Sequence, residues 1–357
     1  MLQEFEARLA GRRVLVTGHT GFTGGWLCIW LHAIGARVTG LSLAPNTQPN
    51  LFTAAGIEAI VESHIGDIGT MPVVRAAFEA CQPEVVFHLA AQPLVSRAFE
   101  DPLESFASNV MGTAHVLEAA RQCAATRAVV CVTTDKVYAD QDWHWGYRET
   151  DTLGGKDPYS ASKAAAELIA ATYQKTLASR GNSVAIATAR GGNIIGGGDW
   201  ADNRIVPDFV RAVVDNQSLV LRNPDAIRPW QHVLALVHGY IVLAARLLEQ
   251  PQAAQAWNFG PLNQQSEPVG ALVEGLAEAW RRPDLQYEKP KFPETRFLHV
   301  DSTKSRRDLG WQPPIVFADT VRMTAEWYRD FYAGTASARD LCQQQIGRYR
   351  TALGTVR

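Results

Sequence analysis

The first half of the chain alternates short, β-rich apolar runs with segments of helical periodicity. The runs are Arg13–Thr17, Ala36–Leu43, Glu84–Leu89 and Arg127–Thr133. Most of their positions are apolar without the alternation of a half-exposed strand, which indicates strands buried on both faces. Buried strands joined by helices predict a parallel sheet with crossover helices packed on its two faces.

The rest of the chain continues this alternation but becomes less regular after about residue 190. Helical patterns are expected from Tyr159 to about Leu177 and over His232–Glu249, and further strands over Ser183–Ala189 and Ala256–Phe259. Residues 191–204 are rich in glycine and polar side chains. This change of texture predicts a second, looser lobe that begins in the loops after the sheet.

We therefore predict an α/β fold, a doubly wound parallel sheet with a smaller, interleaved C-terminal lobe. The sheet domain is expected to comprise residues 1–190 plus about 232–259, and the second lobe about 191–231 plus 260–357. A chain of 357 residues suits two lobes, because single cores usually stop growing at about 250–300 residues.

Charge and cysteine content exclude several classes of partner. A net charge of -2, from 34 Lys+Arg and 36 Asp+Glu, creates no broad field for nucleic acid or an anionic membrane. No signal peptide or membrane span is expected, and we predict a cytoplasmic protein. The cysteines form no CxxC pair and no cluster with zinc-ligand spacing, so no metal site is predicted. They are Cys28, Cys81, Cys123, Cys131 and Cys342.

Three glycines follow the first strand with the spacing GxxGxxG, at Gly18, Gly21 and Gly24. Glycine is needed where the backbone turns sharply and where it must approach a pyrophosphate closely. The helix that follows offers free N–H groups and the positive end of its dipole to phosphates. An ordinary turn can have the same spacing, but the strand before it and the helix after it favour a dinucleotide site in a Rossmann sheet.

The segment after the second strand favours NAD as the dinucleotide. A basic residue there usually holds the 2′-phosphate of NADP, and no Lys or Arg occurs from Gly40 through Phe52. The acidic residue that usually binds the ribose of NAD is also missing. Ser42 and Asn46 are the candidates for hydrogen bonds to the ribose.

Two polar clusters are expected to meet at the carboxyl edge of the sheet, where such folds bind their ligands. Tyr159 and Lys163 are four residues apart on one helix face, and an ammonium close to a phenol lowers the pKa of the phenol. Thr134, Asp135 and Lys136 directly follow the preceding strand. Together the clusters supply a hydroxyl, a phenol, a carboxyl and two amines for proton transfer. An amphipathic Tyr–Lys pair and a salt bridge at a strand end remain the simpler alternatives.

These motifs occur in an order that resembles the extended short-chain dehydrogenases/reductases. They are TGxxGxxG from Thr17, His88–Ala91, Asn109–Thr113, Thr134–Lys136, YxxxK from Tyr159 and Arg190–Asn193. An Asp followed by Glu or Lys after the catalytic Thr marks the sugar 4,6-dehydratases of that family, and Lys at this position resembles the CDP-glucose 4,6-dehydratases. The resemblance runs from about Gly11 to Pro313.

The resemblance implies an NAD-dependent lyase that converts CDP-glucose into CDP-4-keto-6-deoxyglucose. Tyr159, with Thr134 bonded to the same hydroxyl, would take the 4-hydroxyl proton, and Lys163 would hold the nicotinamide ribose. Lys136 would be the base at C5 and Asp135 the acid at the C6 hydroxyl, although the division between these two stays open. Beside Tyr159 and Lys163, cofactor contacts are implied for Gly18, Thr20, Gly21, Phe22, Gly24, Asp67, Ile68, Leu89, Ala90 and Ala91.

Two of these cofactor residues have an equally good structural explanation. Asp67 and Ile68 follow the expected third strand of the sheet, which precedes the Glu84–Leu89 run. They resemble the pair that contacts the adenine edge in the family. They also fit a helix cap followed by a core residue.

Substrate contacts are expected mainly in the second lobe. The resemblance implies that Asn109 and Asn193 contact the nucleotide sugar. A diphosphate needs cations that bind it in forks, and Arg has the better shape for this than Lys. Arg204, Arg222 and Arg228 are the candidates, each of which could instead be a solvated surface charge.

Two rival functions remain from the sequence. A nucleotide-sugar 4-epimerase would use Thr134, Tyr159 and Lys163 but would not need Asp135 and Lys136. A non-catalytic NAD-sensing protein on the same scaffold would need none of these groups, since fold does not fix function. The resemblance further suggests a homodimer built through helices beside the sheet, including the Tyr159 helix.

Overall fold

In the computed structural model, residues 2–179, 184–261, 266–289 and 299–355 are described, and within them seven parallel strands form one sheet. Its order is β11-β6-β5-β4-β1-β2-β3. The chain adds β2 and β3 on one side of β1 and then adds β4, β5, β6 and β11 on the other side. The strands are β1 Arg13–Thr17, β2 Arg37–Ser42, β3 Glu62–Ile65, β4 Val85–His88, β5 Ala128–Val132, β6 Ala185–Arg190 and β11 Ala256–Asn258. This is the predicted doubly wound sheet.

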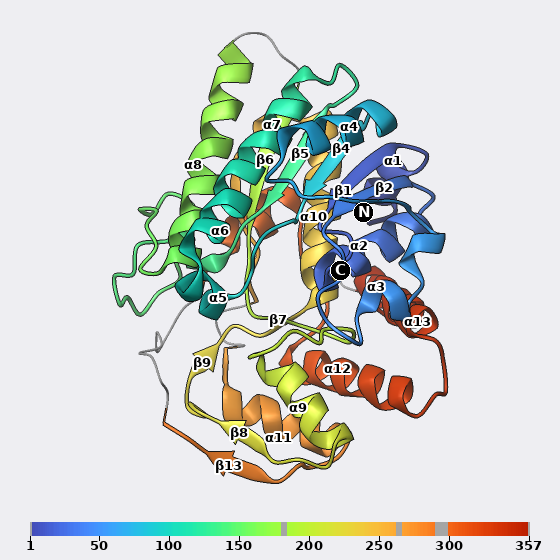
Figure 1. Ribbon diagram of the computed structural model, residues 1–357, viewed down its shortest axis with the longest axis vertical. Helices are drawn as coiled ribbons and strands as arrows, with labels where there is room; N and C mark the ends of the chain where they lie inside the picture. The colour runs from blue at the N-terminus through green and yellow to red at the C-terminus, as the bar shows by residue number, and fades with distance from the viewer. Residues whose placement is uncertain (1, 180–183, 262–265, 290–298, 356–357) are drawn as a thin grey trace.

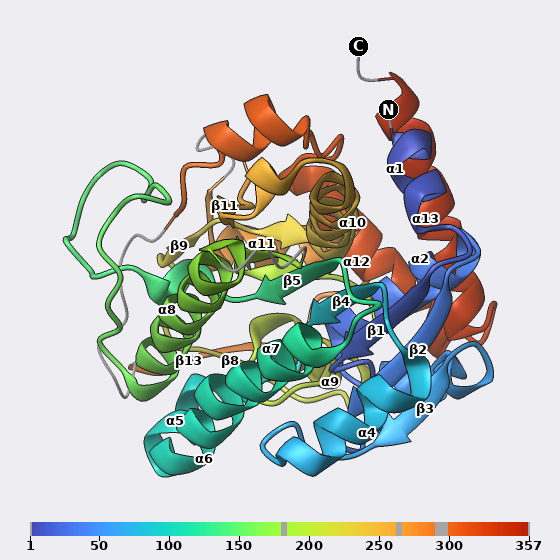
Figure 2. The ribbon, with the colours of Figure 1, turned by 90° about the horizontal axis from the view of Figure 1, so that it is seen from above.

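Both faces of the sheet are buried because successive side chains of each strand enter different cores. In β1, Val14 and Val16 pack in the core beneath α2 and α10, whereas Leu15 belongs to the core beneath α4, α7 and α8. Figure 2 shows these two helical layers on either side of the strands. The first layer contains α1 Leu2–Leu9, α2 Phe22–Ala33 and α10 Val233–Glu249; the second contains α4 Met71–Cys81, α7 Gly112–Gln122 and α8 Pro158–Ser179.

Short helices complete the second layer beside α8. They are α5 Val95–Glu100, α6 Pro102–Phe106 and a π-helical turn over Ala107–Met111 that runs directly into α7. A small helix α3 (Leu51–Ala54) and the 3₁₀ turns Ile57–Ala59, Asp135–Val137 and Pro251–Ala253 occupy loops between strands and helices.

The second lobe lies beyond the carboxyl edge of the sheet (Figure 1). Its described residues form three strand pairs, β7 with β10, β8 with β13 and β9 with β12, packed with α9, α11 and α12. The strands are β7 Ile194–Ile195, β8 Leu219–Leu221, β9 Ile227–Arg228, β10 Gln231–His232, β12 Glu267–Pro268 and β13 Leu285–Tyr287. The helices are α9 Ile205–Val214, α11 Val269–Ala279 and α12 Phe317–Tyr332, and a π-helical turn covers Ser305–Leu309.

The interleaving of the lobes follows from the chain path. α10 and β11 return to the sheet, where β11 pairs with β6. The last helix, α13 (Ala338–Thr355), packs on α12 of the second lobe and also on α2 and α3. Tyr349 anchors α13 to the sheet layer, because its buried ring meets Trp30 of α2 and its hydroxyl bonds the buried His238 of α10.

The predicted elements agree closely with the structure at their centres. Each strand expected in the first half begins or ends within one or two residues of the observed one. The strand expected from Ser183 begins at Ala185, and Ser183 itself lies outside the described residues. None of the helices in the described part is long and apolar enough to cross a membrane.

Candidate active site

The candidate site lies where β1, β4, β5 and β6 end at their carboxyl edge, facing the second lobe (Figure 1). Loops from these strands carry the glycine turn, residues 89–92, residues 133–138 and residues 191–193. Parallel strands bring these distant segments together because all their carboxyl ends open on the same side.

The glycine turn has no room for side chains at two of its three positions. A Cβ on Gly18, whose φ is +82°, would lie 2.8 Å from the backbone nitrogen of Ala90. A Cβ on Gly24 would lie 2.1 Å from the carbonyl oxygen of Gly18. Gly21 caps α2 without any side-chain hydrogen bond. The first turn of α2 therefore keeps N–H groups that no capping side chain satisfies, which suits phosphate oxygens.

Thr20 and Ser42 join the glycine turn to the end of β2. The Thr20 hydroxyl donates to the carbonyl oxygen of Leu43 at 2.8 Å and is 2.8 Å from the Ser42 hydroxyl. Both side chains are buried. These hydroxyls bond each other and position the turn. The predicted contacts of Thr20 with the cofactor and of Ser42 with its ribose remain predictions. Asn46 is exposed, and Phe22 is half-buried on the first turn of α2.

The residues after β4 are tied to β1 through a buried histidine. His88 contacts the hydroxyls of Thr17 at 2.7 Å and Thr113 at 3.0 Å, and the Thr17 hydroxyl accepts from the backbone N–H of Ala90. Burial lowers the pKa of His88 to about 3, so its imidazole is neutral. This histidine thus holds the predicted cofactor segment Leu89–Ala91 against the glycine turn.

Asp67 and Ile68 match the structural alternative only in part, because Ile68 is a core residue but Thr70, not Asp67, is the cap residue of α4. The exposed Asp67 carboxylate accepts from the backbone N–H of Gly69 at 2.8 Å, which closes a turn. Ile68 is buried against α7, where Gly112 leaves space for it. Their proposed contact with adenine remains a prediction.

The start of α8 brings Tyr159 and Lys163 to the end of β5. Asp157 caps the helix by accepting from the backbone N–H and the hydroxyl of Ser160, and Pro158 occupies the first helical turn. Lys163 donates to the carbonyl oxygen of Val132 at 3.1 Å. Burial lowers the pKa of Lys163 to about 8.

Burial raises the pKa of the Tyr159 phenol to about 12, with a hydrogen bond to Thr134 acting in the opposite direction. The negative charge of Asp135 raises this pKa further, and Arg204 lowers it. The sequence predicted a lowered pKa from Lys163. The direction is reversed because the spacing of Tyr and Lys gives their proximity but not the desolvation of the phenol.

Asp135 is a buried carboxyl group with one oxygen engaged. Thr134 donates to its Oδ1 at 2.9 Å, whereas Oδ2 has no hydrogen-bond partner among the described residues. Burial raises the pKa of Asp135, and the cations Lys136 and Arg228 act against this rise. Gly192 lines the carboxyl, since a Cβ there would lie 2.2 Å from Oδ1. Lys136 follows in an exposed position.

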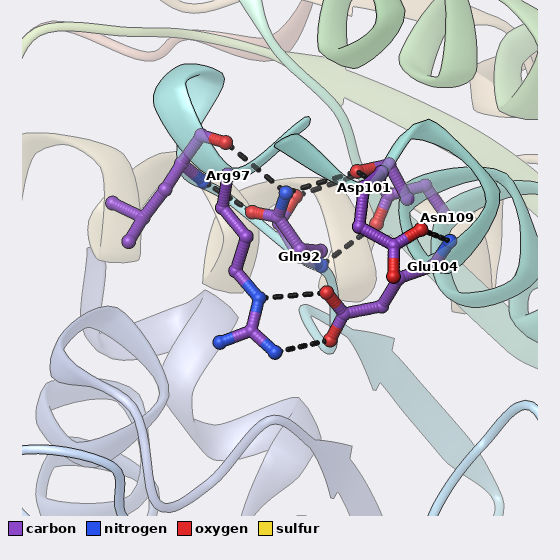
Figure 3. A network of polar contacts seen from close by, with 7 residues as sticks. Gln92, Arg97, Asp101, Glu104 and Asn109 are labelled. Atoms are coloured by element: carbon purple, nitrogen blue, oxygen red, sulfur yellow. Dashed lines mark hydrogen bonds and ion pairs between the residues drawn. The ribbon is translucent and has the colours of Figure 1, made fainter. Parts of the chain in front are cut away.

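Asn109 lies beneath the site in a different environment from the one expected of a substrate ligand. Its amide oxygen accepts from the backbone N–H of Gln92 at 2.8 Å, and its nitrogen donates to the Gln92 carbonyl and to the Ser162 hydroxyl. Figure 3 shows the Gln92–Asn109 contact beside the exposed Arg97–Glu104 ion pair. Because these bonds engage both ends of the buried amide, Asn109 positions the loop after β4 and the first turn of α8.

The candidate substrate residues of the second lobe reach the site to different extents. Arg228 and Arg204 act electrostatically on Asp135 and Tyr159, respectively, and Arg204 pairs with Asp199 at 3.0 Å. Arg222 is exposed at the end of β8 and acts on Asp208 of α9. Asn193 has a left-handed backbone, with φ +50°, and is half-buried directly after Gly192.

Comparison with known proteins gives the family. The sequence matches the family described as GDP-mannose 4,6 dehydratase over residues 15–324. The chain belongs to this family. The expected extended dehydrogenase/reductase relationship is confirmed, since dehydratases and epimerases of nucleotide sugars are its relatives.

Individual members of the dehydratase family and its structural neighbours are similar over nearly the whole chain. A CDP-glucose 4,6-dehydratase from Salmonella typhimurium is 42% identical, covering 91% of this chain and 92% of the relative. The UDP-glucose 4-epimerase of Thermus thermophilus, solved with NAD, is 25% identical with a TM-score of 0.76, covering 89% of this chain and 99% of the epimerase. A dTDP-glucose 4,6-dehydratase from Streptomyces venezuelae, solved with NAD bound, has a TM-score of 0.76 at 24% identity and covers 90% of this chain and 98% of that one.

Several residues that organise this dehydratase-family site were not singled out from the sequence. Ser162 donates to the carbonyl oxygen of Tyr159 at 2.7 Å and accepts from Asn109. Glu167 lies one turn beyond Lys163 and bonds the ends of β5 and β6. The continuation of the Tyr–Lys spacing by four residues was the available signal for Glu167.

Four tryptophans that the sequence placed in loops have different surroundings in the structure. Trp200 and Trp230 are buried in the second lobe, where Trp200 packs on Trp327 and Tyr328 of α12. Trp143 and Trp145 pack together near Tyr147.

No group of three or more His, Cys, Asp or Glu suited to a metal occurs among the described residues.

Proposed function

We propose that this chain is a CDP-glucose 4,6-dehydratase that uses NAD and forms CDP-4-keto-6-deoxyglucose with loss of water. The observation that carries the proposal is the buried Asp135 carboxyl beside the phenol of Tyr159. Its Oδ1 accepts from Thr134, and its Oδ2 has no hydrogen-bond partner in the part of the chain that the structure describes. An epimerase needs the phenol but has no use for a buried acid. The 42% identical relative named CDP-glucose 4,6-dehydratase supports the same substrate.

The residues around the glycine turn fit a dinucleotide. The backbone of Gly18 lies close to the loop after β4, Gly21 and Gly24 lie close to Gly18, and the start of α2 has no side-chain cap. The 2′-phosphate of NADP would find no Lys or Arg in the segment from Gly40 through Phe52. Phe22, Asp67, Ile68 and Leu89–Ala91 would line the cofactor, and Lys163 would bond its ribose. When bound, NAD supplies a hydride acceptor at C4 of the sugar and the same hydride for C6.

The oxidation step requires a base at the 4-hydroxyl, and Tyr159 is our candidate. As a phenolate it would accept the 4-hydroxyl proton while the C4 hydrogen leaves as hydride. Thr134 is bonded to the phenol. If its hydroxyl turns from Asp135 to donate to the phenolate, it would offset part of the cost of burying that charge.

Elimination of water from C5 and C6 requires an acid and a base on one face of the sugar. A carboxyl whose pKa is raised by burial holds its proton and can give it to the departing C6 hydroxyl, so Asp135 suits the acid. Lys136 would accept the C5 proton made acidic by the new ketone and would return a proton to C5 as hydride reaches C6. Its side chain is exposed and would be covered by the bound sugar.

The proton balance of these steps gives Thr134 a second role, which is to pass a proton from Tyr159 to Asp135. After turnover, the proton from O4 is on Tyr159 and Asp135 has lost one to the departing water. One proton must therefore pass from Tyr159 to Asp135 before the next cycle. The Thr134 hydroxyl is bonded to both groups and offers this path without solvent.

The second lobe would hold the nucleotide diphosphate. Arg228 is the leading candidate for the diphosphate because it comes from the second lobe and its charge reaches the site, where it acts on Asp135. Arg204 acts on Tyr159 but is paired with Asp199, and Arg222 is further from the strand ends, near Asp208. Asn193 would bond the sugar from the loop after β6, whereas Asn109 would position α8 from below.

We also propose that the chain is a cytoplasmic homodimer. All five cysteines are unpaired and buried, which suits a reducing compartment. Exposed apolar side chains cluster on neighbouring elements beside α8, a surface suited to a second copy of the chain. They are Phe99, Leu103, Phe106, Met111 and Leu168. Light scattering of a Leu103→Asp/Leu168→Glu variant should report a monomer if this surface is the interface.

A panel of CDP-, dTDP-, UDP- and GDP-glucose tests the function directly. The expected result is a 4-keto-6-deoxy product, detected by its absorbance in alkali, with CDP-glucose as the preferred substrate. An epimerase would instead give a 4-epimer without loss of water. Formation of galactose-configured product and no dehydration would therefore replace the dehydratase proposal.

A further inference from the structure

Glu167 is a buried carboxylate that lies next to the proposed catalytic groups without belonging to them. It follows Lys163 by one helical turn on α8 and is 3% exposed. Its carboxylate points away from solvent toward the ends of β5 and β6, which α8 covers. A carboxylate in such a place must have its oxygens satisfied by the elements that meet there.

Three groups from two strands satisfy this carboxylate. The Thr133 hydroxyl, at the end of β5, donates to Oε1 at 2.5 Å. The Thr188 hydroxyl and an Arg190 guanidinium nitrogen, both from β6, donate to Oε2 at 2.7 Å each. Glu167 therefore links the helix of Tyr159 and Lys163 to the strand that ends beside Thr134.

Arg190 extends this linkage to the far side of the site. Its second terminal nitrogen donates to the Tyr138 hydroxyl at 2.9 Å and to the carbonyl oxygen of Glu149 at 3.2 Å. Tyr138 in turn donates to Asn258 of β11 at 2.6 Å. The segment from Thr133 to Tyr138, which contains Asp135 and Lys136, is thus held at both of its ends by one connected buried network.

We propose that the buried Glu167–Arg190 pair is a positioning device of the active site, which fixes the Thr134–Lys136 segment against Tyr159 and Lys163. This inference rests on the proposed function for the identity of the reaction and on the bonds above for the positioning. Glu167 acts through Thr133, and Arg190 acts through Tyr138. Neither residue is placed among the groups that touch the sugar.

The geometry distinguishes positioning from simple stabilisation. A pair that only stabilised the fold would need no bond to Thr133, the residue directly before Thr134. Proton transfer among Tyr159, Thr134 and Asp135 depends on hydrogen-bond distances, and a displacement of about 1 Å costs on the order of 100-fold in rate. Loss of the pair should therefore reduce the rate of reaction more than the affinity for substrate.

The pair also contributes to the charge of Lys163. The charged or titratable groups that act on Lys163 are Glu167 on its own helix, Cys131 of β5 and the neutral His88 of β4. Cys131 and Glu167 both raise the pKa of Lys163. Burial raises the pKa of the Cys131 thiol to about 12, so that thiol is neutral near pH 8 and Glu167 is the charged group that favours the ammonium form. Replacement of its carboxylate by an amide removes that support and leaves the Arg190 cation without a counter-charge, and both changes favour the neutral amine.

The first test compares Glu167→Gln with a matched control, Glu6→Gln. Glu6 is also a buried carboxylate paired with an arginine, Arg350, but it lies on α1 in the opposite helical layer. Both variants should lower the Tm. Only Glu167→Gln should lower kcat, by about 10- to 100-fold with KM changed less than about threefold. It should also move the alkaline loss of NAD binding by about half a unit or more toward lower pH.

A second pair of variants keeps both charges and so avoids loss of the fold. Thr133→Val and Thr188→Val each delete one hydroxyl bond to Glu167 with nearly unchanged shape. Positioning predicts that Thr133→Val lowers kcat at least about fivefold more than Thr188→Val, because Thr133 adjoins Thr134. If Glu167→Gln does not fold, the comparison of the two Thr variants decides whether the Glu167–Arg190 pair positions the Thr134–Lys136 segment.

The outcomes separate this inference from the proposed function. Wild-type kcat and an unchanged pH dependence of NAD binding in Glu167→Gln, with a Tm loss like that of Glu6→Gln, would make the pair purely structural. Equal effects of the two Thr variants would do the same. If wild-type protein makes no 4-keto product from CDP-glucose, the proposed function fails, whereas the pH dependence of NAD binding in Glu167→Gln still tests the pair.

Discussion

Thr134 donates a 2.9 Å hydrogen bond to Oδ1 of Asp135, and Oδ2 of the same buried carboxyl has no hydrogen-bond partner among the described residues. This relationship leaves one carboxyl oxygen available for a ligand and connects the other to the phenol of Tyr159 through a single hydroxyl. An acid for the C6 hydroxyl and a base for the 4-hydroxyl are therefore coupled within three side chains.

Asp135→Asn should stop the reaction after oxidation of the sugar. Asn has nearly the same shape but lacks the acidic proton that assists loss of the C6 hydroxyl, so product formation should fall by about 10²–10⁴. NADH absorbance of the enzyme should build up with CDP-glucose. In deuterium oxide the C5 hydrogen of the bound sugar should still exchange, because the base at C5 is intact.

Lys136→Met should stall at the same stage but without exchange at C5. Met keeps the length of the apolar stem and removes the amine, so the ketone forms while the C5 hydrogen stays in place. Mass spectrometry of sugar recovered from deuterium oxide distinguishes the two variants. Exchange retained in Lys136→Met and lost in Asp135→Asn would reverse the two roles, and normal turnover would make Lys136 a structural residue.

Tyr159→Phe should remove most activity while NAD affinity stays nearly unchanged. The phenol acts on the sugar, whereas the dinucleotide is expected to be held by the Gly18–Gly24 turn and Lys163. Loss of a general base typically costs about 10²–10⁴ in rate, so turnover within about threefold of wild type would exclude Tyr159 from the mechanism. Fluorescence titration with NAD provides the control for an intact cofactor site.

NAD binding should weaken as the pH rises through about 8. Burial lowers the pKa of Lys163 to about 8, so its ammonium is present below that pH and is lost above it. A neutral amine is a weaker donor to the ribose hydroxyls, and the dissociation constant should therefore increase between pH 7 and pH 9.5 by about 10-fold. Lys163→Ala should bind NAD more weakly and without this pH dependence; a transition that persists in the variant would assign it to another group.

The sequence predicted the sheet well because its central strands are apolar on both faces. β3 is the exception, since Glu62–Ile65 at the sheet edge has no apolar run, and its existence was implied only by the position of Asp67 after it. The motifs also identified the residues at the strand ends. Strand order brings those ends together whatever the details of packing.

What the sequence could not supply was the partner of each polar group. Asn109 stands in a recognisable motif, but its amide bonds Gln92 and Ser162, which are 17 and 53 residues away in the chain. The pKa of Tyr159 is raised where a lowering was expected for the same reason, because burial depends on long-range packing that spacing does not encode. The Glu167–Arg190 pair likewise joins residues whose relation appears only when α8 packs on β6.

Substrate labelled with deuterium at C4 should yield product with that deuterium in the C6 methyl group. The site has groups to take and return protons within one crevice, and the proposed sequence of oxidation, elimination and reduction is redox-neutral, so no external electron acceptor is consumed. Free NADH should not accumulate. A mixture of C4-deuterated sugar and sugar carrying a heavy carbon isotope elsewhere would reveal transfer between molecules by mass spectrometry. Product that carries both labels would show that NADH leaves the site between oxidation and reduction. Release of NADH in proportion to substrate would indicate an ordinary dehydrogenase, whereas retention of deuterium within each molecule requires that oxidation and reduction occur during a single residence of the sugar.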